Sequence, residues 1–175
     1  MNNYNRSFDT RKLVLISVLV AQGMVLGYIE KMLPLPFIVP GAKLGLANII
    51  TLTAIYFLTF RESTSVVLLR VILTAVTFGS LSSFLYSLSG GILSLIAMAA
   101  VLKVFKDELS LISVSIIGSI CHNIGQLLVA AFIIHNVLIF TYLPILLIVA
   151  VPTGIFVGLV ARVLIQYLKK TNFVQ

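Results

Sequence analysis

Long apolar runs without charge alternate along the chain with short segments that carry charged or polar residues. A transmembrane helix needs about 20 predominantly apolar residues, with a lower limit of about 17. The stretches that meet this requirement cover residues 13–29, 44–60, 63–79, 83–102, 110–134 and 142–168. The pattern therefore predicts an all-α integral membrane protein. We expect a bundle of six transmembrane helices that forms a single domain over residues 1–175.

A turn, rather than a charged segment, separates the third and fourth of these spans. Residues 71–102 contain no charged residue, and as one helix they would be roughly 48 Å long against a hydrocarbon core of ~30 Å. The Gly79–Ser83 stretch is the natural place for the chain to reverse. We also expect His135 and Asn136 to separate the last two spans, and Pro152 to kink the sixth.

Composition excludes the common classes of soluble protein. Hydrophobic residues make up 60% of the chain and charged residues only 10%, whereas soluble domains have ~45–50% and ~25%. A small protein in water could not cover its surface with so few charges. The composition therefore excludes a soluble enzyme, a nucleic-acid-binding protein and a disordered tail, and the partner it requires is a lipid bilayer.

The basic residues account for the net charge of +7 and set the expected orientation. An even number of spans places both termini on one side, and the side richer in Lys and Arg is cytoplasmic. Lys31 and Lys43 fall on one side, and Arg70 lies within a span. The others fall opposite, and they are Arg6, Arg11, Lys12, Arg61, Lys103, Lys106, Arg162, Lys169 and Lys170. We expect both termini in the cytoplasm, and the first helix uncleaved although Ala21–Gly23 resembles a signal-peptide cleavage site.

The fifth span carries a polar stripe. Its members follow the spacing i, i+4, i+7, i+11, which places them on one helix face, and they are Ser115, Ser119, His122 and Gln126. Asn123 points elsewhere. Polar groups inside a membrane are costly, so the stripe faces either a ligand or another helix. For His122 and Gln126 these two interpretations stay open, whereas for the serines we favour bonding between helices.

Polar residues of three spans fall at a similar depth. Because successive helices run in opposite directions, Asn48, Tyr86 and Gln126 should all lie in the outer half of the membrane. They could line a pocket that opens outward, with Lys43 at its rim to meet an anionic group. Alternatively, Lys43 extends to the interface and Tyr86 belongs to an aromatic belt.

Arg70 is the charged residue well inside a span, about 10 Å from its cytoplasmic edge. At that depth the sequence favours a side chain that extends to the interface. If Arg70 instead faces the bundle, it is a strong anion site.

Small residues four apart mark close packing between helices. Such pairs occur at Ser17 and Ala21, at Gly23 and Gly27, and in the sixth span at Gly154 and Gly158. They could pack helices within the chain or dock another membrane subunit. The proline-rich stretch over residues 30–41 could cap a pocket or act as a rigid connector.

The sequence lacks the residues that several chemical functions require. The chain has no G-x-x-x-x-G-K-[ST] phosphate loop, so it cannot hydrolyse ATP by that route. Its acidic residues fall at span ends or in loops, and they are Asp9, Glu30, Glu62, Asp107 and Glu108. That placement argues against secondary active transport and against Mg²⁺-dependent diphosphate chemistry as functions of the chain. The single cysteine, Cys121, excludes a Cys-based zinc cluster, and we expect no catalytic residues, no metal site and no cofactor.

The sequence resembles a known bacterial family over essentially its whole length. The resemblance rests on Pro40–Ile49 and Cys121–Leu127, and on Gly79–Leu81 and Ser87–Gly91 around the middle turn. The family carries two names, heptaprenyl diphosphate synthase component I and Gx transporter. In turn it resembles the S components of energy-coupling factor (ECF) transporters, which are six-helix membrane proteins that bind a vitamin-like molecule.

The resemblance implies partners and a location. It implies a small-molecule substrate, a membrane T component, two ATPase subunits and the bacterial cytoplasmic membrane. Ser17 and Ala21 match the small-x-x-x-small pattern that contacts the T component, with serine in place of the usual alanine. Residues 30–43 match the loop that often covers the substrate. The substrate itself is not implied, because pocket residues differ among S components.

Our preferred hypothesis is a substrate-binding component of an ECF-type uptake system for a vitamin-like or a quinone- or isoprenoid-related molecule. The candidate site residues are Lys43, Asn48, Arg70, Tyr86, His122, Asn123 and Gln126, and the candidate partner surface is Ser17, Ala21, Gly23 and Gly27. The alternative is a non-catalytic accessory subunit of heptaprenyl diphosphate synthase. A third hypothesis is a packing or assembly protein without a ligand.

Overall fold

The described part of the chain is entirely helical. A computed structural model describes residues 10–33, 45–105 and 108–171. Its elements are α1 (Thr10–Met32), α2 (Asn48–Phe57), α3 (Phe60–Phe78), α4 (Leu81–Phe105), α5 (Leu111–Ile134), the 3-10 helix η2 (Val137–Tyr142) and α6 (Leu143–Lys170). No strand occurs within these residues, which confirms the predicted all-α class.

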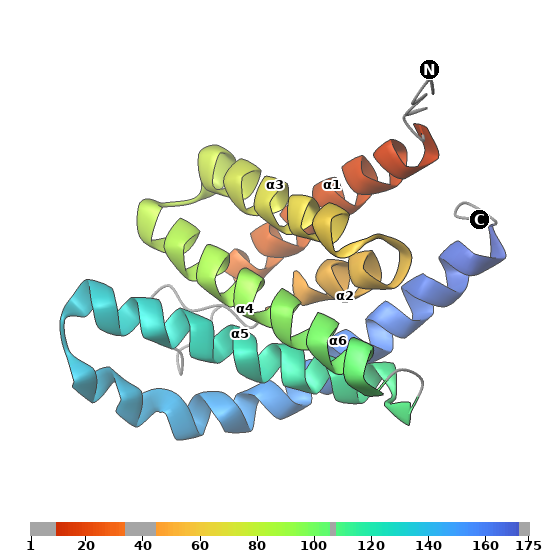
Figure 1. Ribbon diagram of the computed structural model, residues 1–175. Coiled ribbons are helices and arrows are strands. Elements are labelled where there is room, and N and C mark those ends of the chain that lie inside the picture. The colour runs from red at the N-terminus through yellow and green to blue at the C-terminus, as the bar shows by residue number, and fades with distance from the viewer. Residues whose placement is uncertain (1–9, 34–44, 106–107, 172–175) are drawn as a thin grey trace, which may run out of the picture.

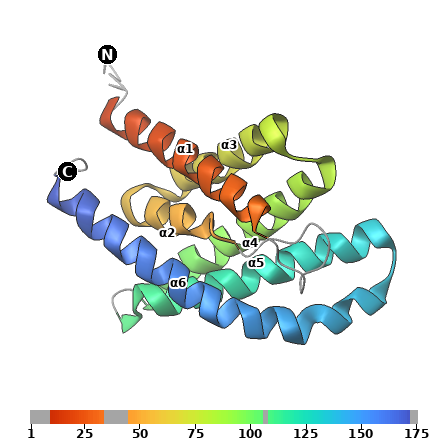
Figure 2. The same ribbon diagram turned by 180° about the vertical axis from the view of Figure 1, so that it is seen from behind.

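The long helices pack in the order α1, α3, α4, α5, α6, and α2 lies in the middle of the bundle (Figure 1). Helix α5 packs against both α4 and α6, and α1 lies along α3. The short helix α2 contacts all five of the long helices. Figure 2 shows the same arrangement from behind, with α2 enclosed by α1, α3 and α6. The interior of the bundle is therefore built around the start of α2.

The second predicted span differs from the observed helix. We expected a helix over residues 44–60, but α2 has 10 residues and is therefore about 15 Å long, half of a hydrocarbon core. Gly45 has φ +86°, in the left-handed region, and Leu58 is extended, so the helix is bounded on both sides. Residues 45–47 and 58–59 of the apolar run thus lie outside the helix, and Phe60 already begins α3.

Within the described residues, four segments are long and apolar enough to cross a membrane, and they are α1, α4, α5 and the continuous η2–α6 stretch. α3 has 19 residues but carries Arg61, Glu62 and Arg70. The chain is therefore a multi-pass membrane protein, while six crossings remain a prediction.

The predicted reversals are confirmed. α3 ends at Phe78 and α4 begins at Leu81, and a Cβ atom on Gly79 would lie 2.6 Å from the Cα atom of Ala75. α5 ends at Ile134, and the next residue, His135, has a left-handed φ of 52° that turns the chain into η2. α6 contains Pro152 and bends along its length (Figure 1).

The first turn of α1 and the last turn of α6 lie at the same end of the bundle (Figures 1 and 2). Lys12 pairs with Glu62 at 3.4 Å, which ties the start of α1 to the start of α3. Lys169 donates to the Tyr56 hydroxyl and lies 4.6 Å from the centre of its ring, which ties α6 to the end of α2. The ends of α1, α3 and α6 that carry Lys12, Arg61 and Lys169 therefore lie at one end of the bundle, and we still predict that this end is cytoplasmic.

Large hydrophobic side chains face outward while polar side chains face inward. Val76, Phe132 and Val137 are each 77–80% exposed. The inside contains an apolar cluster with Leu19, Leu52 and other residues of the bundle, but also many buried polar groups. Apolar side chains on the outside suit lipid as the surrounding solvent.

Candidate functional site

Buried polar side chains gather in the interior of the bundle. Each is at most 7% exposed, and together they come from the five helices α1 to α5. They are Glu30, Asn48, Thr51, Arg70, Ser87, His122, Asn123 and Gln126. A group of this kind is expensive inside a membrane protein unless its members bind one another or a ligand.

Arg70 of α3 faces the bundle, so the expectation that its side chain extends to the interface is wrong. The residue is 5% exposed, and two glycines leave room for it. A Cβ atom on Gly23 would lie 2.9 Å from its Cδ atom, and one on Gly91 would lie 3.3 Å from its Nη2 atom. Its Nη2 atom donates to the Thr51 hydroxyl at 3.5 Å, and Glu30 attracts it electrostatically.

Glu30 was missed by the sequence analysis, which placed it at the end of a span. It lies in the last turns of α1, but its side chain turns inward and is 4% exposed. Its Oε1 atom accepts hydrogen bonds from the backbone N–H of Gly45 and, at 3.3 Å, from that of Leu46. The spacing of Gly23, Gly27 and Glu30 is i, i+4, i+7, and this shared helix face was the signal that could have revealed its burial.

His122 of α5 lies beside the turn at Gly45, and Gln126 contacts His122. Their Nε2 atoms are 2.9 Å apart. The imidazole packs against two glycines, because a Cβ atom on Gly90 would lie 2.9 Å from its Cε1 atom and one on Gly45 3.2 Å from its Cδ2 atom. Ser115 and Ser119 are buried as well. The predicted polar stripe thus faces the interior along its whole length.

Asn48 begins α2 and reaches the same region. A Cβ atom on Gly45 would lie 2.8 Å from its Nδ2 atom, so the Asn48 amide and the His122 ring flank the same glycine. The side chain is 1% exposed, and neither its oxygen nor its nitrogen has a hydrogen-bond partner among the described residues. The Nε atom of Arg70 also lacks one there.

A small cavity lies among these residues. Arg70, Glu30, His122 and Ser87 line it, together with Gly23, Gly27, Gly45, Ala47, Val71 and Thr74. It has about 10 Å³ of space for the centre of a water molecule, which is room for about one water. The described residues therefore enclose a small cavity with a charged pair and an imidazole in its lining, and a pocket that opens to the outside remains a prediction.

Two predicted site residues lie elsewhere. Tyr86 packs in an apolar cluster with Leu127 and Ile139, among others. The Nδ2 atom of Asn123 donates to the backbone oxygen of Leu146 at 3.0 Å and so joins α5 to α6. Lys43 lies outside the described residues.

The small residues of α1 lie on two different faces. Ser17 and Ala21 are exposed, whereas Gly23 and Gly27 are buried and contact Arg70 and Thr74 of α3. The glycines therefore pack helices within the chain, and only the first pair is available to a partner. Gly154 and Gly158 likewise pack against α5, close to Ile116 and Ile112.

A comparison with known families now places the chain. The family model described as heptaprenyl diphosphate synthase component I matches residues 19–164. The chain belongs to this family.

The fold has a solved counterpart. The chain is similar to a structure described as the S component of a bacterial ECF transporter, with a TM-score of 0.63 and 22% identity over 94% of this chain and 97% of the other. No curated protein matches the sequence. The comparison confirms the predicted fold class, including its resemblance to an S component.

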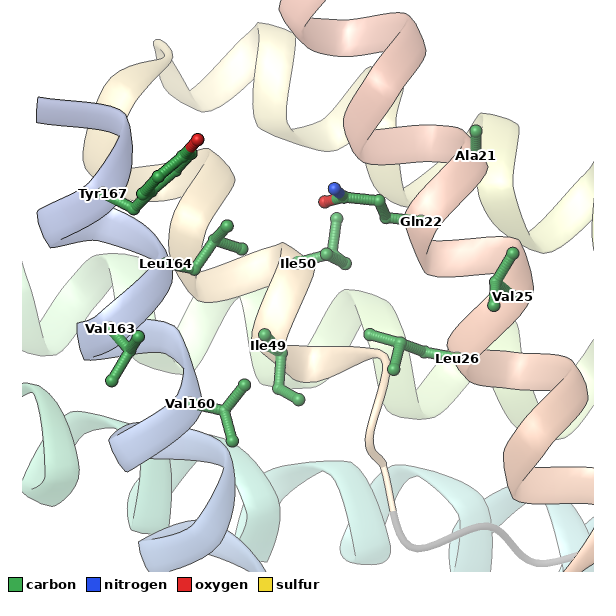
Figure 3. Close-up of a pocket in the computed structure, with 10 residues that line it drawn as sticks. All are labelled: Ala21, Gln22, Val25, Leu26, Ile49, Ile50, Val160, Val163, Leu164 and Tyr167. Carbon is green, nitrogen blue, oxygen red and sulfur yellow. The ribbon is translucent and has the colours of Figure 1, made fainter. Parts of the chain in front are cut away.

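An apolar groove runs along the outside of the chain, between α1, α2 and α6 (Figure 3). Its volume is about 630 Å³. The lining residues are Ala21, Gln22, Val25, Leu26, Ile49, Ile50, Val160, Val163, Leu164 and Tyr167. Ala21 therefore lies both on the exposed small-residue strip and at the groove.

The described residues of the chain contain no group of three or more His, Cys, Asp or Glu side chains placed to hold a metal ion. The interior polar residues offer instead a guanidinium, an imidazole, two amides and backbone N–H groups. Such groups bind and orient polar parts of a ligand.

Proposed function

We propose that the chain is the substrate-binding membrane component of an ECF-type uptake transporter in the bacterial cytoplasmic membrane. Its substrate is a small vitamin-like or quinone- or isoprenoid-related molecule. The observation that carries the proposal is the convergence of Asn48, Arg70, His122 and Gln126 on the interior of a fold similar to an S component. Asn123 and Tyr86 then support the site by holding α4, α5 and α6 together.

Unmet hydrogen-bonding capacity supports a ligand over a purely structural network. A buried polar group that lacks a partner costs about 1–3 kcal/mol. The Asn48 amide and the Arg70 Nε atom are in this state within the described residues. A ligand with acceptors and donors would satisfy them. Because the cavity has room for about one water, binding requires side chains or helices to move.

The strip of Ser17 and Ala21, which continues into the apolar groove, suits a transmembrane helix of the T component. Small exposed residues let a neighbouring helix approach closely. The energy then comes from separate ATPase subunits, because the chain has no phosphate loop of its own.

The family name supports a second candidate, a non-catalytic accessory subunit of heptaprenyl diphosphate synthase. That function requires a separate catalytic chain, which would carry the acidic residues that hold Mg²⁺ and diphosphate. The two candidates therefore predict different partners.

Purification of the tagged chain from its native membranes distinguishes the transporter component from the synthase subunit. We expect a T component and ATPase subunits to accompany the wild-type protein. Ala21→Leu should place a bulky side chain in the strip, at a cost of about 1–3 kcal/mol or roughly 5- to 150-fold in partner recovery.

Ala100→Leu is the matched control, because Ala100 is exposed on α4, far from the strip, and should leave recovery unchanged. Recovery of a soluble synthase chain in place of the transporter subunits, with no effect of Ala21→Leu, would favour the accessory-subunit function.

A further inference from the structure

The place in which the Glu30 carboxylate is bound indicates the chemical class of the substrate. We infer that the chain binds its substrate through a carboxylate group, which takes the position that the Glu30 carboxylate occupies in the structure. The inference rests on the proposed function and narrows it.

The position is built for an anion. Two backbone N–H groups, those of Gly45 and Leu46, point at one carboxylate oxygen. The turn that contains them leads into α2, since Asn48 N–H donates to the Gly45 oxygen at 2.8 Å and Ile49 N–H to the Leu46 oxygen at 3.1 Å. The start of a helix carries partial positive charge and favours anions.

Arg70 and Asn48 provide independent support. Arg70 lines the cavity, is 95% buried and has an Nε atom without a hydrogen-bond partner among the described residues. The Asn48 amide, next to Gly45, likewise has none there. A substrate carboxylate with its adjoining polar atoms could satisfy these groups, which the single Glu30 carboxylate does not.

An exchange of carboxylates is electrostatically balanced. Among the described residues, Glu30 is the carboxylate that attracts Arg70, and a second carboxylate beside it would add another negative charge to a buried site. When a substrate carboxylate replaces Glu30, the charge near Arg70 is unchanged and the two N–H groups keep an acceptor. A neutral substrate would leave these groups unmatched if it displaced Glu30.

The test removes the internal carboxylate and supplies a small external one. The full chain carrying Glu30→Ala is reconstituted in phosphatidylcholine nanodiscs, and its thermal unfolding is measured in sodium acetate and in sodium chloride at equal ionic strength. We expect saturating acetate to raise the Tm of this variant by about 3–5 °C relative to chloride. Wild-type protein, whose site is filled, should not respond.

Three controls make the result specific. Glu30→Ala combined with Arg70→Gln should lose the response to acetate, and Glu62→Ala, which removes a carboxylate at the other end of the bundle, should show none. Sodium phosphate should have a smaller effect than acetate on Glu30→Ala, and an equal or larger effect would overturn the assignment to a carboxylate.

If Glu30→Ala does not fold, the same measurement is made on Glu30→Gln. Its neutral side chain still accepts hydrogen bonds from the N–H groups of Gly45 and Leu46, and acetate can displace it. Absence of a specific acetate response in the folded variant overturns the inference. The proposed function is judged separately, by the molecule that the wild-type chain retains. A retained neutral molecule together with no acetate response would refute the carboxylate and leave the transport function standing.

Discussion

Arg70→Gln is expected to lower the free energy of unfolding by about 3–5 kcal/mol, because it removes the guanidinium that the buried Glu30 carboxylate attracts. Both side chains are at most 5% exposed, so water cannot compensate either one. Chemical denaturation in detergent micelles, followed by circular dichroism, measures the change.

The matched double variant separates charge balance from loss of packing. Glu30→Gln combined with Arg70→Gln removes both charges, and we expect it to recover most of the loss. Arg162→Gln, at an exposed position of α6, should change stability by less than about 0.5 kcal/mol. If the double variant is as unstable as the single one, the two charges do not balance each other.

Gly154→Ala is expected to destabilise the bundle by about 1–3 kcal/mol through overpacking. The added Cβ atom would lie 2.6 Å from the Cα atom of Ile116, and backbone cannot rotate away as a side chain can. α5 and α6 would have to separate. Thermal unfolding of the purified variants gives the effect.

Gly27→Ala provides the comparison for this prediction. The same added atom would lie 3.7 Å from the nearest atom of Thr74, an ordinary contact. Alanine favours a helix over glycine by about 1 kcal/mol, so this variant should be neutral or more stable. Equal losses for the two substitutions would contradict the close packing of α5 and α6.

The helices were predictable where length and hydrophobicity decide them. The long apolar runs predicted the boundaries of α1, α4, α5 and α6 to within a few residues. The turn at Gly79 was predicted because one uncharged run is too long for a single membrane-spanning helix. α2 was not predictable in this way. Its boundaries depend on the left-handed backbone at Gly45 and the extended backbone at Leu58, which a count of apolar residues does not register.

The candidate site was predictable only in part. Helical periodicity fixes which residues share a face, so the inward stripe with His122 and Gln126 was found from spacing alone. Burial of Arg70 depends on glycines of two other helices, and burial of Glu30 depends on its pairing with the turn at Gly45. Such contacts join residues far apart in sequence, so the spacing of Gly23, Gly27 and Glu30 could indicate that Glu30 faces inward but not what it contacts.

Native mass spectrometry of the chain extracted from its own membranes tests the central claim most directly. We expect the wild-type protein to retain a small molecule, and His122→Ala combined with Gln126→Ala to lower its occupancy at least about tenfold, as loss of ~1.4 kcal/mol or more of binding implies. Ser65→Ala, at an exposed position of α3, should retain it fully. A folded wild-type protein that carries no small molecule, or a double variant that carries as much as the wild type, would contradict a substrate site in this interior.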